Sequence, residues 1–385
     1  MPNRRINFYT EKALSLAAFI SSNCRFPSSS HHLKVRKFIK NFLDGLGLEV
    51  KTQKFKTQLR KPLEGKIERA FETIEGVPYT NSPSAEIKKT FTVDCRFGLY
   101  NDVRSVDLED KIAIVREGKK PFRKKEELLK AKGAVGVIVY KEDVDLIFNG
   151  ISAGLLPVFS IRRSDYVKVL NEEINLTVIT RPIEVEGENI WVEFGNRGPY
   201  VNLIAHYDSK PFTEGAIDNA TGVSSLLALA LRLSQIPFNA PYRLRLLFTD
   251  LEEYGLLGAR VFVNSLEENE IKSSIAVSVD TIGWHNPAVL SSDGEGQNDP
   301  HLLEVIHKIL KDLGLREKFN FIPGRSGRSD HIPFRNKGAK TLFLGSNPFP
   351  IRHTEADSYE EINPIILDDW MGVLTIFATQ LHRYF

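Results

Sequence analysis

The sequence predicts an α/β protein with a mixed, largely parallel sheet, helices on both faces of that sheet, and a smaller β-rich insert. Two features of the chain indicate this fold. In the second half, short apolar runs alternate with helical segments, and almost continuously apolar runs are typical of strands covered on both faces. Between Pro62 and Pro182, short apolar runs come with loops, as in a separate small module. We therefore expect a main domain of residues 1–61 and 186–385, with residues 62–185 as the insert.

The part before the insert is expected to contain two helices and one strand. The helices cover residues 9–21 and 31–47, and Ser28–Ser30 can cap the second helix. Leu48–Phe55 alternates apolar and polar residues, which predicts a strand. Within the insert we expect strands at Lys111–Val115, Ala134–Tyr140 and Leu156–Phe159, and a helix at Phe122–Lys132.

The part after the insert is expected to alternate strands with helices. The predicted strands are Trp191–Phe194, Val201–Ala205, Leu244–Phe248, Ile275–Val279 and Thr341–Leu344. The predicted helices cover residues 219–234, 255–266, 300–313 and 367–384. Ligands of such sheets bind beyond the carboxyl ends of the strands, so residues that follow these strands are candidates for function.

The composition is that of a soluble globular protein, with 42% hydrophobic and 26% charged residues. A net charge of +2 gives no strong field for nucleic acid, and no apolar run approaches the roughly 20 residues that span a bilayer. We expect neither a nucleic-acid nor a membrane partner. Cys24 and Cys95 form no disulfide framework, and Glu11 and Lys12 interrupt the only signal-peptide-like segment. These features predict a cytoplasmic protein.

One stretch, Val201–Thr221, places charged residues at the end of an apolar strand. The strand leads into His206 and Asp208, and Asp218 lies just before a long apolar segment. Burying unpaired carboxylates is costly or forces them to take up protons, and a bound cation would remove that cost. Further ligand-type side chains follow the other strands: Glu252, Glu253, Asp280 and His353.

Each of these residues also has a plainer interpretation. His206 could be a hydrogen-bonded structural histidine, and Asp218 could cap the following helix. Glu252 and Glu253 could form a solvated first helical turn. Their coincidence at one edge of one sheet nevertheless favours a metal site. Nitrogen and oxygen ligands without thiolate suit zinc in a catalytic site, with manganese or cobalt as alternatives. Their number suits two ions about 3.5–4 Å apart that share a carboxylate.

The order of the motifs carries a family resemblance. The motifs are HYD at 206–208, GAIDNATG at 215–222, FTDLEEYGLLG at 248–258, SVD at 278–280 and HTEAD at 353–357. Together they resemble the co-catalytic di-zinc aminopeptidases, which are zinc exopeptidases of phosphorylase/hydrolase-like fold. In the insert, DKIAIV at 110–115, a helix, and KGAVGVIV at 132–139 resemble the protease-associated domain, which is typically inserted in larger peptidases.

The resemblance implies two zinc ions per chain. One zinc would take His206, Asp218 and Asp280. The other would take Glu253 and His353, with Asp218 bridging the two ions.

The resemblance also implies roles for acids that do not bind metal. Glu252 would be the general base for a metal-activated water and would pass the proton to the leaving amine. Asp208 would hold His206 in the right tautomer, and Asp357 would support His353 similarly. The implied protein is a zinc-dependent metallo-aminopeptidase that hydrolyses N-terminal residues from peptides.

A second branch of the same fold offers an alternative. Ser329–Phe334 and Asn347–His353 resemble the glutaminyl cyclases, which would make the chain a glutaminyl-peptide cyclotransferase with one zinc on Asp218, Glu253 and His353. Against this, the insert is typical of peptidases, and Arg352 stands where cyclases tend to carry a tryptophan. Asp330 and His331 would then assist substrate binding or support the ligands.

A third interpretation is a receptor-like binding protein on this fold that has lost its metals. The presence of all five ligand candidates and of Glu252 speaks against it.

Overall fold

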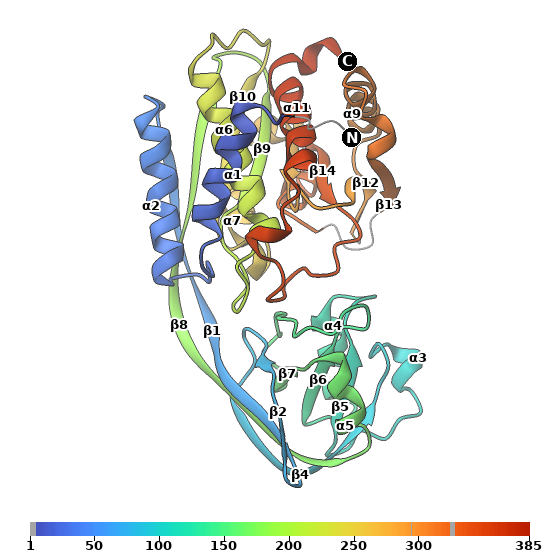
Figure 1. The fold of residues 1–385 in the computed structure, drawn as a ribbon. Coiled ribbons are helices and arrows are strands. Elements are labelled where there is room, and N and C mark those ends of the chain that lie inside the picture. Colours follow the sequence, from blue (N-terminus) through green and yellow to red (C-terminus); the bar gives the residue numbers. More distant parts are fainter. Residues whose placement is uncertain (1–4, 294, 324–327) are drawn as a thin grey trace.

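The computed structural model describes residues 5–293, 295–323 and 328–385. Figure 1 shows a main domain of layered helices and strands and a smaller insert, joined by two long strands.

The two connecting strands are much longer than predicted. β1 (Lys51–Arg69) and β8 (Glu173–Phe194) pair antiparallel along almost their whole length. The expected strands Leu48–Phe55 and Trp191–Phe194 are therefore only the ends of this ribbon that lie in the main domain. Residues of β1 alternate between half-buried and exposed over the first eight positions, so no buried apolar face marks the strand in the sequence.

The sheet of the main domain is mixed and largely parallel, as predicted. Its strand order is β13-β12-β14-β11-β9-β10-β8. The strands are β9 (Tyr200–His206), β10 (Arg243–Thr249), β11 (Ile275–Val279), β12 (Pro287–Ser292), β13 (Asn320–Pro323) and β14 (Lys340–Ser346). The strands β10, β9, β11 and β14 are parallel neighbours, whereas β8 is antiparallel to β10 and β12 to β14. Four strand ends therefore meet at one edge.

Helices cover both faces of this sheet. They are α1 (Phe8–Ile20), α2 (Ser30–Gly45), α6 (Thr221–Ser234), α7 (Leu257–Asn264), α8 (Glu268–Ser273), α9 (Pro300–Asp312), α10 (His331–Arg335) and α11 (Pro364–Gln380). Leu203 and Leu246 belong to the core formed with α1, α2, α6, α9 and α11. Their neighbours Ile204 and Leu247 face the opposite core, formed with α7, α8 and α10, because successive strand residues alternate sides. Among the described residues, no helix is long and apolar enough to cross a membrane.

The insert is a small α/β module. Its elements are β2 (Glu72–Ile74), β3 (Val77–Pro78), β4 (Ala85–Asp94), α3 (Tyr100–Val103), β5 (Ile112–Arg116), α4 (Phe122–Ala131), β6 (Gly136–Tyr140), β7 (Val158–Ser160) and α5 (Tyr166–Val169). The strands β4, β5, β6 and β7 are parallel neighbours, and β4 also pairs with β8. The ribbon thus joins the insert and the main domain into one continuous sheet. The boundaries at residues 62 and 185 stay predictions.

Candidate metal centre

The carboxyl ends of neighbouring strands bring four ligand candidates together. His206 is the last residue of β9, and β9 lies between β10 and β11 in the sheet. Glu253 lies in the turn that follows β10, and Asp280 directly follows β11. Asp218 lies in the turn between β9 and α6, so it is not the N-cap of that helix, a position taken by Ala220. The plainer interpretation of Asp218 as a helix cap is therefore wrong.

His353 completes the group from a loop beyond β14. Its backbone has a φ of +63°, in the left-handed region, and its side chain is 14% exposed. The other ligand candidates are buried.

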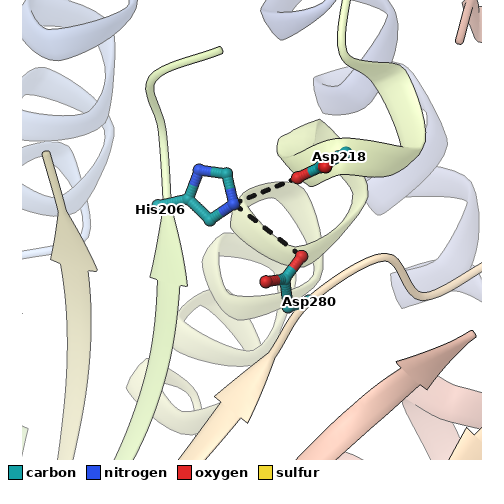
Figure 2. A group of neighbouring side chains, drawn as sticks. All are labelled: His206, Asp218 and Asp280. Atoms are coloured by element: carbon teal, nitrogen blue, oxygen red, sulfur yellow. Dashed lines mark ion pairs between the residues drawn. The ribbon is translucent and has the colours of Figure 1, made fainter. Parts of the chain in front are cut away.

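These five residues form two groups of three that share Asp218. Figure 2 shows the first group, in which His206 pairs with Asp218 and with Asp280. His206 Nε2 lies 3.2 Å from Asp218 Oδ1 and 3.7 Å from Asp280 Oδ1. In the second group, His353 Nε2 lies 3.3 Å from Asp218 Oδ2 and 3.0 Å from Glu253 Oε2. Asp218 therefore offers one carboxylate oxygen to each group. The structure thus brings all five predicted ligand candidates together in two neighbouring groups.

Three ligand-type atoms in these groups lack a hydrogen-bond partner although they are buried. They are His206 Nε2, Glu253 Oε1 and Asp280 Oδ1. Buried polar atoms are normally paired, because leaving them unpaired costs free energy. Bound cations would satisfy all three atoms at once. The donor set of imidazole nitrogen and carboxylate oxygen, without thiolate, fits zinc.

The charges in the site depend on one another. Burial opposes protonation of His206, but the surrounding carboxylates, with Glu252 foremost, outweigh it and raise the pKa of His206 well above its usual value. Burial likewise opposes ionisation of Asp218, but His206 and His353 hold its pKa well below the usual range. The site is thus strongly acidic and stabilises positive charge.

Glu252 points into the site without joining either ligand group. Its Oε2 lies 3.9 Å from His206 Nε2, and the residue is only 8% exposed. Burial and the nearby carboxylates of Glu253, Asp330 and Asp280 raise the pKa of Glu252 well above its usual value. A carboxylate with a raised pKa accepts a proton more readily, which suits a general base.

Asp208 contacts both the histidine and the glutamate turn. Its carbonyl oxygen lies 3.2 Å from His206 Nδ1, and its Oδ1 lies 3.5 Å from the same nitrogen. Its carboxylate also accepts the backbone N–H groups of Glu252 at 3.1 Å and Glu253 at 3.2 Å. Asp208 therefore orients the turn that carries the two glutamates, in addition to its predicted place beside His206.

Asp357 does not support His353, so that expectation is wrong. Its carboxylate accepts the backbone N–H groups of Ile217 at 2.7 Å and of Asp218 at 3.1 Å. Burial and the charge of Asp218 raise the pKa of Asp357 to about 8. Asp357 therefore orients the turn of the shared ligand.

Asp330 and His331, in the segment Ser329–Phe334, differ in their contacts. Asp330 is buried, accepts a hydrogen bond from Thr249 and has a second carboxylate oxygen without a partner. Burial raises the pKa of Asp330 to about 7. His331 instead contacts Ser278 Oγ at 3.1 Å and Asp293 Oδ2 at 3.1 Å, so its partners lie outside the ligand groups.

Two further residues near the site were missed in the sequence. Asp250, which precedes the glutamate turn, contacts His32 and Arg36 of α2. Lys210 is buried, donates to the carbonyl of Glu253, and places Nζ 3.5 Å from Glu253 Oε2. For Asp250, the signal in the sequence was the pair His32 and Arg36, two polar residues four positions apart on the buried face of α2.

A cavity of about 140 Å³ opens beside His353 where the insert meets the main domain. It is lined by Val77, Ile147 and Asn149 of the insert and by Pro211, Phe212, His353 and Glu355 of the main domain. Its walls combine apolar and polar side chains, and one wall belongs to the insert.

The sheet edge, the two ligand groups and the insert together define a zinc exopeptidase with an inserted protease-associated domain. Residues 189–377 match the model of peptidase family M28, and residues 78–168 match the model of the PA domain. Residues 189–377 therefore form a domain of peptidase family M28, and the insert contains a PA domain.

Curated relatives of the chain include aminopeptidases. The chain is 27% identical to aminopeptidase YwaD of Bacillus subtilis over 384 residues, covering 94% of this chain and 82% of the relative. It is 28% identical to a probable leucine aminopeptidase 2 of Aspergillus oryzae over 302 residues, covering 71% of this chain and 60% of the relative.

Solved structures share the fold. BSAP, a zinc aminopeptidase from Bacillus subtilis, superposes with a TM-score of 0.77 at 24% identity, covering 97% of this chain and 95% of the other. The glutaminyl cyclase of Porphyromonas gingivalis gives a TM-score of 0.54 at 14% identity, with coverages of 97% and 96%. The cyclase is thus the more distant neighbour.

Proposed function

We propose that this chain is a zinc-dependent aminopeptidase that removes residues from the N-termini of peptides and binds two zinc ions. One observation carries the ion count: the two oxygens of Asp218 face two separate ligand groups. His206 and Asp280 complete one group, and Glu253 and His353 complete the other. The family match and the names of the curated relatives support the aminopeptidase activity.

Glu252 performs the proton transfers of the proposed reaction. Bound zinc would polarise the scissile carbonyl and lower the pKa of the attacking water. The carboxylate of Glu252 takes the proton of that water and delivers it to the nitrogen of the leaving peptide. Asp208 supports this role because its carboxylate fixes the backbone of the turn at Glu252 and Glu253.

The cavity beside His353 is the proposed entry for the substrate N-terminus. Its apolar residues Val77, Ile147 and Phe212 suit an apolar side chain, and its size suits one residue better than a folded segment. The insert therefore restricts the accessible substrates to free chain ends.

The experiment is a mass spectrum of the products after the zinc-loaded protein has been incubated with defined peptides. Some peptides begin with leucine or phenylalanine, and others begin with glutamine. Stepwise loss of N-terminal residues supports the aminopeptidase, whereas loss of ammonia confined to the glutamine peptides would establish the cyclase instead. The Glu252→Gln variant is the control. It should process every peptide more slowly than the wild-type chain, because it lacks the proposed base.

A further inference from the structure

The backbone of His353 is held by a residue of the PA domain, whereas the other four ligand candidates are held by the main domain. The amide of Asp218 is held by Asp357, and the amide of Glu253 is held by Asp208. His206 belongs to a central strand, and the amide of Asp280 donates to a carbonyl of the neighbouring strand at 2.9 Å. All of these partners belong to the main domain.

The backbone and ring of His353 contact the PA domain. The ring of Phe148 stacks on the ring of His353, with centroids 5.6 Å apart and planes 25° apart. The backbone N–H of Asn149 donates to the carbonyl of His353 at 3.0 Å, and Phe148 forms a β-bridge with Thr354. Phe148 and Asn149 are buried, so this contact is built into the core of the insert.

Lys141 fixes the segment just before His353. Its Nζ donates to the carbonyl of Pro350 at 2.6 Å and to the carbonyl of Arg352 at 3.3 Å. The ammonium also lies 5.1 Å from the centre of the Phe148 ring. Lys141 is only 5% exposed, whereas most lysines in folded proteins are exposed to solvent.

The contacts of Lys141, Phe148 and Asn149 surround a strained backbone. His353 has a φ of +63°, a conformation that a residue with a Cβ adopts at a cost. Such a conformation persists when the surrounding structure determines it. Three residues of the PA domain do so here, through contacts with the segment Pro350–Thr354.

We propose that the PA domain is the positioning element for the second ligand group, because Lys141 and Phe148 hold His353 against Asp218 and Glu253. The PA domain thereby sets the metal affinity of this group and leaves the group of His206, Asp218 and Asp280 unaffected. This inference rests on the proposed two-ion function. It assigns to the PA domain a role in metal binding itself, apart from access to the site.

The test is a metal titration of the full-length chain at buffered free zinc, with bound zinc measured after equilibrium dialysis. Lys141→Met keeps the apolar stem and removes the ammonium that holds the two carbonyls. We expect one of the two zinc ions to bind about 10- to 100-fold more weakly, the usual effect of losing a group that orients a ligand. The other ion should keep its wild-type affinity. Lys124→Met, at an exposed lysine of the same domain, is the matched control and should change neither.

A second variant, Phe148→Leu, keeps an apolar side chain in the insert and removes the ring that faces His353. It should weaken the same ion, and it decides the question if Lys141→Met fails to fold by circular dichroism. Unchanged affinity for both ions in a folded variant, or equal weakening of both, would overturn the inference. A wild-type chain that binds only one ion would contradict the two-ion proposal instead, and the affinity of that ion in both variants would still test the role of the PA domain.

Discussion

His32 Nε2 lies 2.8 Å from Asp250 Oδ1, and neither side chain is exposed to solvent. The other oxygen of Asp250 accepts hydrogen bonds from Arg36 at 3.0 Å and from the Tyr207 hydroxyl at 2.7 Å. Asp250 immediately precedes the turn that carries Glu252. Helix α2 thus holds Asp250, the residue that leads into the turn of Glu252 and Glu253.

Replacement of Asp250 should therefore destabilise the whole fold. Asp250→Ala removes the nearer carboxylate partner of the buried Arg36 guanidinium and leaves only Glu188, at 3.9 Å, and breaking a buried pair in this way costs about 3–5 kcal/mol. Urea unfolding at neutral pH measures the loss. Glu184→Ala removes an exposed ion pair with Lys56 and should cost less than about 1 kcal/mol. Equal losses in the two variants would contradict the importance of the buried network.

Glu252→Gln should separate catalysis from metal binding. The amide cannot take a proton from water, so turnover of a leucine-initiated peptide should fall by about 10²–10⁴-fold. Zinc content should stay at the wild-type value, because Glu252 belongs to neither ligand group. Normal turnover in the zinc-loaded variant would remove Glu252 from the role of base.

The two ligand groups predict different metal losses for two aspartates. Asp218→Ala removes the shared ligand, so both ions should be lost. Asp280→Asn weakens only the group of His206, so about one ion per chain should remain. Zinc is measured by elemental analysis after dialysis, and the exposed Asp143→Asn is the control. Full zinc content in Asp218→Ala would exclude that residue as a ligand.

Asp293 predicts a pH dependence of stability away from the metal site. Burial opposes its ionisation, but His331 and Arg335 lie at 3.1 and 2.6 Å and lower the pKa of Asp293 far below its usual value. A lowered folded-state pKa stabilises the protein above the unfolded-state pKa near 3.9, and this stabilisation is lost as the pH falls toward the folded-state pKa.

Asp293→Asn should therefore lower the free energy of unfolding by about 1.5–3 kcal/mol at pH 7. The difference from wild type should stay constant down to about pH 5 and shrink below about pH 4. Urea unfolding across this range measures it, with the exposed Asp44→Asn as control. A difference that grows on acidification would contradict the assigned sign.

Ile147→Trp should narrow the cavity beside His353 without touching the ligands. Ile147 lines this cavity from the insert. We expect kcat/KM for peptides that begin with phenylalanine to fall about tenfold or more, with a smaller effect for those that begin with alanine. Val167→Trp, at a position 70% exposed on the same domain, is the control. Equal effects on both peptides would argue against this entry for the substrate.

The central strands β9, β10, β11 and β14 were predictable because their apolar runs reflect burial on both faces. The bounds of β11 are those expected from Ile275–Val279, and those of β9, β10 and β14 differ by one or two residues. The ribbon was underestimated because most residues of β1 are half-buried or exposed and form no such run. β13 was missed for a related reason: Asn320–Pro323 is only partly buried, at the end of the sheet.

His206, Glu253 and Asp280 were predictable because each lies at or shortly after the end of an apolar strand, whereas Asp218 and His353 lie farther along, in the segments that follow β9 and β14. The supporting contacts were not predictable, because they depend on the path of loops. Asp357 accepts amides of the Asp218 turn rather than orienting His353, and no periodicity encodes that choice. Two partners of Asp250, His32 and Arg36, lie in α2, more than two hundred residues earlier in the chain.

The ribbon of β1 and β8 makes the PA domain a lateral branch of the chain. Arg60 and Pro182 lie opposite each other in the ladder, so the chain leaves and returns at points one strand spacing apart. Closing such a gap with a short turn costs little loop entropy. A deletion, duplication or exchange of the branch therefore leaves the topology of the main sheet intact. Gene rearrangement can thus remove or replace the PA domain as a unit, while every strand that ends at the metal centre keeps its neighbouring strands.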